Sequence, residues 1–190
     1  DRTLIPENSP YWISQNPYTE NVSLTILAGT ELRFFENNYF GIGGKLSIEG
    51  TENNPVVLHG VDDATRWGGL YSGASTYGGG TPTTSIGEEI NLHLDQNNNF
   101  ISGNKITHLN ITNADRPMDF SNNFDVYVDG LNISEFYSGM EVGSNSHIAN
   151  VVLNNLQLSS GIENSFGING GAYFSNVEVI NTFGYAITAT

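Results

Sequence analysis

The sequence contains no cysteine and no long apolar run. Disulfide bonds therefore do not stabilise the fold. The lack of cysteine does not indicate a compartment, because exported proteins also occur without it. A membrane-spanning helix needs about 20 consecutive apolar residues, and no segment approaches that length. The chain must fold around an ordinary hydrophobic core, and its 190 residues are enough for one domain of that kind.

Positive charge is also scarce. The chain has 6 Lys and Arg residues against 20 Asp and Glu residues, which gives a formal net charge of −14. Phosphate backbones and anionic membrane surfaces repel such a chain. We therefore expect no nucleic-acid partner and no membrane insertion.

Ala, Glu, Lys and Leu at helical spacing are scarce as well. The abundant residues are Asn, Gly, Ser, Thr and Tyr, among them 22 Gly and 9 Tyr. These residue types favour strands and turns over helices. The composition therefore predicts an all-β protein.

One apolar pattern occurs four times in the second half of the chain. Each copy reads apolar, two residues, apolar, one residue, apolar, one residue, and then usually Asn. The starts lie 22, 20 and 26 residues apart, at Ile106, Val128, Ile148 and Phe174. An earlier near-repeat has the same period, since LTILAGT at residues 24–30 is followed 22 residues later by LSIEGT.

Short strands that recur every 20 to 26 residues are typical of a solenoid. Coils stacked about 4.8 Å apart turn each repeated position into a ladder. We predict two inward ladders, Ile106/Val128/Ile148/Phe174 and Leu109/Leu131/Val151/Val177. We also predict a polar ladder at a turn, formed by Asn113, Glu135, Asn155 and Asn181. Dividing the length by the repeat predicts roughly seven or eight coils.

The segments KLSIEGTENNPVVLHG, from Lys45 to Gly60, and RWGGLY, from Arg66 to Tyr71, carry a resemblance. With the repeats, they resemble right-handed parallel β-helix proteins of the pectate-lyase-like type. They are most similar to the opening coils of exported bacterial surface proteins. The resemblance implies a right-handed parallel β-helix and an extracellular or cell-surface location. It does not imply one activity, because such folds include lyases, glycoside hydrolases, tailspikes and adhesins.

We expect residues 1–20 to form an N-terminal cap and residues 21–190 to form the β-helix. An insertion loop is expected at about residues 72–91, which are rich in Gly, Ser and Thr. No C-terminal cap is apparent in FGYAITAT, and a solenoid needs one. We therefore expect the remainder of a longer β-helix, or a partner chain, at that end. The start at Asp1 indicates a processed or truncated product.

Three acids share one position of successive units, each 22 residues from the next: Asp119, Glu141 and Glu163. Their apolar neighbours point inward, so we expect the acids to point outward in a row. Close carboxylates raise one another's pKa or recruit a cation such as Ca²⁺. Lyases that the chain resembles often use such a calcium to neutralise a uronate. Two neighbours could also serve as acid and base. The simplest interpretation is a solvated acidic stripe.

Arg116 is the basic residue nearest to these acids. In a lyase it would abstract the proton or hold the substrate, and otherwise it forms a surface ion pair. The lyase and hydrolase motifs of the resembling proteins, Gly-His-Gly with paired Asp or Arg-x-Pro-x-x-Arg, are not found. The four histidines, which share no repeat position, are interpreted as turn or surface residues: His59, His93, His108 and His147.

Aromatic rings near turns are candidates for stacking on sugars. The candidate ligand-binding residues are Tyr71, Tyr127, Phe136 and Tyr137. Trp67 in the WGG turn is interpreted as a packing residue. The leading hypothesis is a non-catalytic, glycan-binding extracellular module. The alternative is a polysaccharide lyase or glycoside hydrolase with Asp119, Glu141 and Arg116 in its cleft.

Overall fold

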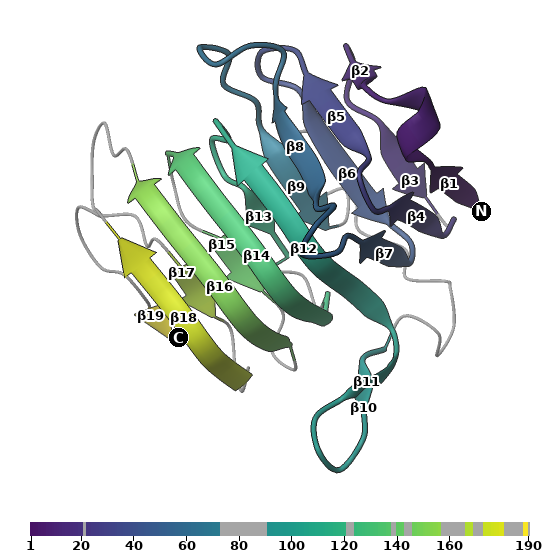
Figure 1. Ribbon diagram of the computed structural model, residues 1–190, viewed down its shortest axis with the longest axis vertical. Coiled ribbons are helices and arrows are strands. Elements are labelled where there is room, and N and C mark those ends of the chain that lie inside the picture. The colour runs from purple at the N-terminus through teal and green to yellow at the C-terminus, as the bar shows by residue number, and fades with distance from the viewer. Residues whose placement is uncertain are drawn as a thin grey trace.

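The computed structural model is a β-solenoid of about six turns, built from parallel stacked strands with almost no helix (Figure 1). It describes residues 1–20, 22–72, 91–120, 124–137, 140–142, 146–156, 166–168, 173–180 and 188–189. The strands form three rows along the solenoid, because equivalent segments of successive coils pair in parallel. The all-β solenoid predicted from the repeats is confirmed.

The first two rows belong to one sheet. In the early coils the first row contains β1 (Arg2–Leu4), β4 (Leu24–Leu27) and β7 (Leu46–Glu49). The second row contains β2 (Tyr11–Ile13), β5 (Glu31–Phe34) and β8 (Val56–Gly60). In the later coils one long strand serves both rows: β12 (Asn104–Thr112), β14 (Val126–Phe136), β16 (His147–Leu156) and β18 (Tyr173–Ile180).

The long strands bend where the two rows meet. The first half of β12 pairs with β7 and its second half pairs with β8, with His108 between them at φ 44°. The same left-handed bend recurs at Gly130, Asn150 and Asn176. Gly and Asn tolerate positive φ better than other residues, which explains their presence at three of these four positions.

The third row forms a second sheet behind the first (Figure 1). Its members are β3 (Tyr18–Glu20), β6 (Tyr39–Gly43), β9 (Gly69–Ser72), β13 (Met118–Asp119), β15 (Met140–Val142), β17 (Phe166–Ile168) and β19 (Thr188–Ala189). Residues 1–20, expected to form a cap, contribute β1, β2 and β3 to the three rows and a short 3-10 turn, η1 (Pro6–Asn8).

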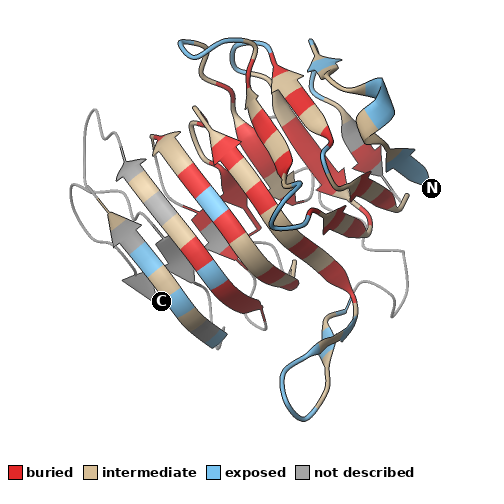
Figure 2. Cartoon of the chain, viewed as in Figure 1, coloured by how far each residue is buried: buried red, intermediate tan, exposed pale blue. Residues whose placement is uncertain are grey.

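The core lies between the rows and is continuous along the solenoid (Figure 2). The register of both predicted ladders is confirmed, because Ile106, Val128, Ile148 and Phe174 pair in register, as do Leu109, Leu131, Val151 and Val177. These residues pack in or against the core, apart from Phe174, whose side chain lies outside the described residues. Trp67 is fully buried, as expected of a packing residue, and stacks on Phe34 with ring centroids 4.0 Å apart. Stacking equivalent apolar residues from every coil therefore gives the chain a single core.

A polar ladder that was not predicted lies at the bend between the first two rows. Asn176 Nδ2 donates to Asn150 Oδ1 at 3.0 Å, and Asn150 Nδ2 donates to Asp129 Oδ1 at 2.6 Å. Of the predicted ladder, Asn113 and Glu135 directly follow the paired residues Thr112 and Ser134 and occupy a left-handed turn, with φ of 56° and 54°. The side chain of Asn155 and all of Asn181 lie outside the described residues.

The first and third rows each contain seven strands from successive coils, which agrees with the lower of the seven or eight coils predicted. Part of the chain also leaves the coils. A hairpin of β10 (His93–Leu94) and β11 (Phe100–Ser102) projects from the solenoid just before β12 (Figure 1). The expected insertion at 72–91 falls almost entirely on residues 73–90, which lie outside the described residues.

Candidate functional site

The turns between the second and third rows form one surface, which we call the corner. It consists of residues 14–17, 35–38, 61–68 and 113–117 from four successive coils. Backbone hydrogen bonds join these turns: Gly68 N–H donates to the Asn38 carbonyl at 2.7 Å, and Arg116 N–H donates to the Gly68 carbonyl at 3.0 Å. Side chains from separate coils are thereby held side by side.

The corner packs tightly because Trp67 and two glycines form its base. The Trp67 indole N–H donates to the Thr112 carbonyl at 2.9 Å. Gly69 has φ +125°, and a Cβ there would lie 1.7 Å from the Arg116 carbonyl oxygen. Only glycine permits this conformation together with this close approach. The WGG sequence therefore positions the turn after β8 against the turn after β12.

The first cavity of the corner, the Tyr39–Tyr71 pocket, has a volume of about 310 Å³. Its polar lining includes Asn16, Asn37 and Asp115. The two tyrosine rings meet edge to face, with centroids 5.5 Å apart and planes 73° apart. The Tyr71 hydroxyl donates to the Gly68 carbonyl at 3.2 Å. This contact fixes the ring at the pocket wall, beside amide and carboxylate groups that can bond to hydroxyls.

An ion pair adjoins this pocket. Arg66 Nε lies 3.6 Å from Asp115 Oδ1, and its guanidinium lies 5.1 Å from the centroid of the Tyr137 ring. Burial raises the pKa of Asp115, and the charge of Arg66 opposes that rise. Asp115 is the residue that carries negative charge into the Tyr39–Tyr71 pocket.

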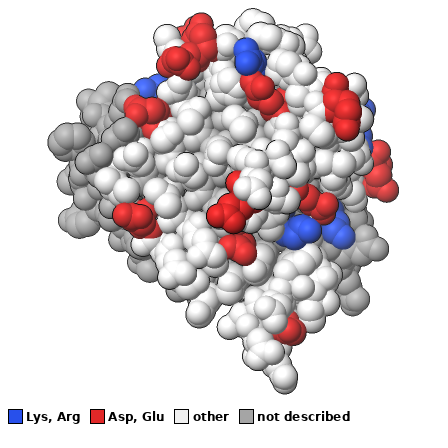
Figure 3. Space-filling view, viewed as in Figure 1, with Lys and Arg blue, Asp and Glu red and all other residues white. Residues whose placement is uncertain are grey.

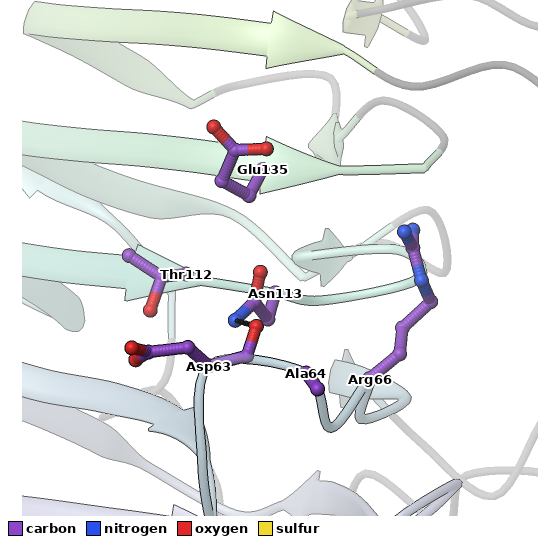
Figure 4. Close-up of a pocket in the computed structure, with 6 residues that line it drawn as sticks. All are labelled: Asp63, Ala64, Arg66, Thr112, Asn113 and Glu135. Carbon is purple, nitrogen blue, oxygen red and sulfur yellow. Dashed lines mark hydrogen bonds between the residues drawn. The ribbon is translucent and has the colours of Figure 1, made fainter.

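A second cavity, the Asp63–Glu135 pocket, has a volume of about 450 Å³ and lies at the same corner (Figure 4). Asp63, Ala64 and Arg66 come from the turn after β8, and Glu135 comes from the end of β14. Asn113 Nδ2 donates to the Asp63 carbonyl at 2.8 Å and closes one side. Its described lining residues are largely polar and include no aromatic ring, so we regard this pocket as the weaker site for sugars.

The predicted ligand-binding residues fall in three environments. Tyr71 lines the Tyr39–Tyr71 pocket, and Tyr137 lies against Arg66 at the same corner. Tyr127 lies on the first row, where its ring stacks on His147. Phe136 is fully buried, so its expected exposure is wrong. The left-handed residue Glu135 interrupts the alternation after Ile133 and turns Phe136 into the core.

The predicted row of acids is only partly formed. Asp119 pairs in register with Glu141, as expected. The partner of Glu141 in the next coil is Gly167, so the placement of Glu163 in this row is wrong. The coil from Ile148 to Phe174 is 26 residues long. Its extra residues move the register, and Glu163 lies outside the described residues.

Asp119 does not have the exposed position that was expected. Its side chain is 6% exposed and accepts a hydrogen bond from Arg116 Nη1 at 3.1 Å. The Arg116–Asp119 contact therefore forms the ion pair that was considered as the simpler role for Arg116. The side chain of Glu141 lies outside the described residues. Neither Asp119 nor Arg116 is among the described residues that line the two pockets.

A metal site is not built by the part of the chain that the structure describes, because no group of three or more His, Asp or Glu is gathered there. Calcium at Asp119, Glu141 and Glu163 stays a prediction. Asp62, which precedes Asp63, accepts hydrogen bonds from the backbone N–H groups of Ala64 and Thr65 at 3.0 and 2.7 Å. It stabilises the turn after β8.

Several residues of the corner were not predicted, among them Tyr39, Asp115 and Arg66. The WGG turn was the available signal, because a buried Trp followed by two glycines indicates closely packed turns. His147 was also misassigned as a turn or surface residue. It is 6% exposed and lies between two tyrosine rings.

Comparisons with models of known protein families, with curated proteins and with solved structures found no match. Within the described residues there is also no helix of the length and apolar character that crossing a membrane requires. The face shown in Figure 3 carries more Asp and Glu than Lys and Arg. Function therefore has to be argued from the corner itself.

Proposed function

We propose that this chain is a non-catalytic β-solenoid module of a secreted or cell-surface protein and that it binds a glycan in the Tyr39–Tyr71 pocket. The pectate-lyase-like resemblance of the sequence fits this proposal, because β-helix proteins of that type act on or adhere to polysaccharides. The observation that carries the proposal is the pocket lining, which combines Tyr39 and Tyr71 with Asn16, Asn37 and Asp115.

This lining matches the two needs of sugar recognition. A pyranose ring has apolar C–H faces that pack on aromatic rings, and hydroxyl groups that need donors and acceptors. The tyrosines supply the aromatic surface, whereas the two Asn side chains offer both donors and acceptors and Asp115 offers acceptors. A cavity of about 310 Å³ is also in the size range of small-ligand sites.

Binding is favoured over catalysis by the environment of Asp119. An acid or base must reach the substrate within hydrogen-bond distance, but the Asp119 carboxylate is covered and bonded to Arg116. The lyase or hydrolase alternative depends on Glu141, whose backbone lies one coil further along. The experiment below therefore tests the enzyme alternative together with the binding proposal.

The experiment uses a panel of neutral and acidic polysaccharides, with Ca²⁺ and with a chelator. Binding is measured by calorimetry, and reducing ends and unsaturated uronates are measured as products. We expect binding of at least one glycan without products. Tyr71→Ala should abolish binding, and Tyr71→Phe should retain most of it because the ring remains.

Two results would overturn the proposal. The first is the absence of binding to every glycan. The second is product formation that Glu141→Gln abolishes, which would make the chain an enzyme. Glu141→Gln is a suitable test because it removes the carboxylate's charge and keeps the size and shape of the side chain.

A further inference from the structure

Two large aromatic side chains remain exposed beside the corner. Trp12 is 55% exposed and Phe35 is 43% exposed. Their ring centroids lie 6.2 Å apart, with the planes tilted by 46°. We call this pair the Trp12–Phe35 platform. Exposed aromatic residues of this size commonly mark binding surfaces when they lie together.

A polar network fixes one side of the platform. Trp12, Arg33 and His59 follow one another in register on the second row. The Arg33 guanidinium lies 5.4 Å from the centroid of the Trp12 ring. Arg33 Nε donates to Glu31 Oε1, and His59 Nε2 lies 2.8 Å from the same oxygen.

The charge of Glu31 is stabilised within this network. Burial acts to raise the pKa of Glu31, but the hydrogen bonds from His59 and Arg33 outweigh that effect and leave the pKa below its usual value. Glu31 therefore stays ionised and keeps Arg33 over the Trp12 ring. The platform is held in place before any ligand arrives.

Two short turns connect the residues of the platform to residues that line the Tyr39–Tyr71 pocket. Asn16 lies four residues after Trp12, and its Oδ1 accepts a hydrogen bond from the Tyr39 N–H at 3.0 Å. Phe35 is followed by Asn37, which lines the pocket, and the Phe35 carbonyl accepts the Asn38 N–H at 3.1 Å. The exposed rings and the pocket therefore lie on the same turns of neighbouring coils.

We propose that the Trp12–Phe35 platform is a second subsite for the same glycan, so that the site takes an extended, uncharged sugar chain. This inference rests on the proposed function. The pocket and the platform together span four successive coils, and coils are about 4.8 Å apart. One pyranose can occupy the pocket, but only a chain of sugars can reach from Tyr71 to Trp12.

Electrostatics favours an uncharged chain over a uronate. The three arginines of this region are already ion-paired, Arg33 with Glu31, Arg66 with Asp115 and Arg116 with Asp119. A uronate would have to compete with these carboxylates, on a protein with a net charge of −14. A neutral sugar needs no such exchange, because aromatic faces and hydrogen bonds are sufficient.

The two tryptophans permit a direct test by fluorescence. Trp12 is 55% exposed, whereas Trp67 is 0% exposed and stays shielded. Neutral gluco-, xylo- and manno-oligosaccharides are titrated as single sugars and as hexasaccharides. Oligogalacturonate of the same length is the charged probe. Emission and quenching by acrylamide, an uncharged quencher, are followed in the full chain and in Trp12→Phe.

We expect a neutral hexasaccharide to protect Trp12 from acrylamide and to bind more tightly than its single sugar. Trp12→Ala should weaken hexasaccharide binding by about three- to tenfold, the range that one aromatic contact is worth. It should leave single-sugar binding unchanged, because the pocket remains. Tyr173→Ala is the matched control, since Tyr173 is 50% exposed and lies on the first row.

Failure of the inference and failure of the proposed function give different results. Equal affinity for a single sugar and a hexasaccharide, with no effect of Trp12→Ala, would overturn the second subsite alone. Binding of oligogalacturonate as tight as that of the neutral chain would overturn the preference for an uncharged glycan. If no sugar of the panel binds the unmodified chain, both proposals are wrong.

Discussion

Aromatic side chains gather in two regions of this solenoid, and the two regions arrange them differently. On the first row, Tyr127, His147 and Tyr173 occupy one register position of three successive coils. Their rings stack nearly parallel, with centroids 5.0 and 4.8 Å apart and planes 11° and 18° apart. At the corner the rings meet at 46° and 73°.

The difference follows from register. Side chains in register repeat at the coil spacing of about 4.8 Å, so flat rings cover one another's faces. The first-row stack therefore leaves His147 only 6% exposed. The rings of the corner and the platform are not in register with one another, since Trp12 pairs with Arg33 and Tyr71 pairs with Gly41. Faces and edges therefore stay available beside a cavity. We infer that the stack serves stability and that the corner serves binding.

The largest expected effect comes from removing the base of the corner. Trp67→Ala removes a buried ring that stacks on Phe34 and an indole N–H that bonds to Thr112. Such deletions typically lower the free energy of unfolding by about 3–5 kcal/mol. Urea unfolding followed by circular dichroism measures the loss. Trp12→Ala is the control and should change stability by less than about 0.5 kcal/mol. A similar loss of unfolding free energy in both variants would contradict the assignment of Trp67 to the core and of Trp12 to the surface.

The next effect comes from the close contact between turns. Gly69→Ala places a Cβ against the Arg116 carbonyl, at a backbone φ of +125° that disfavours side chains. We expect a loss of at least about 1–3 kcal/mol in unfolding free energy, the cost of one strained residue. Thermal unfolding measures it. Gly29→Ala is a milder control, because its φ is +76° but the nearest atom to an added Cβ is 3.6 Å away. A Gly69 variant as stable as the Gly29 variant would exclude the proposed close packing.

The first-row stack should contribute less than the core. His147→Ala removes one ring from between two others, and each aromatic contact is worth about 0.5–1.5 kcal/mol. We expect a loss of about 1–3 kcal/mol in urea unfolding, with unchanged glycan affinity. His147→Phe should restore much of the stability, since it keeps a flat ring. Lost glycan binding in a folded His147→Ala chain would show that the two regions are not separate.

The smallest effect is a dependence on pH. Burial lowers the pKa of His147 below its ordinary value of 6.5. The unfolded chain therefore binds the proton more readily, and stability rises with pH across this window. Stability should be fully present above pH 6.5 and should fall as pH drops from 6.5 towards the folded pKa. Thermal unfolding of the full chain and of His147→Phe measures it, and the variant should lack this decline. A decline of equal size in both would assign it to other groups.

The ladders could be predicted because a repeated apolar pattern determines register. Ile106 and Leu109 pair with the residues expected from the repeat. Phe136 could not be placed, because a left-handed residue before it reversed the alternation. The 26-residue spacing between Ile148 and Phe174 already indicated that Glu163 would leave the row. The 26-residue spacing on the first row also sets the register on the third row, where Glu141 pairs with Gly167.

The corner was largely beyond sequence analysis. Tyr39 and Asn37 come from one coil and Asp115 from the second coil after it, with no common motif. Only the stacking of the coils brings them together, through backbone bonds such as the 3.1 Å contact from Asn37 N–H to the Arg66 carbonyl. Tyr71 was found because it follows the WGG turn. Aromatic residues near turns were a useful signal, but their ring orientations required the structure.

The most direct test of the central claim compares Tyr71→Ala with Tyr173→Ala in calorimetric titrations with the neutral hexasaccharide that binds most tightly. Thermal unfolding of both variants confirms that each is folded. We predict that Tyr71→Ala loses binding and that Tyr173→Ala binds like the unmodified chain. Retained binding in Tyr71→Ala, or lost binding in a folded Tyr173→Ala, would contradict the assignment of binding to the corner.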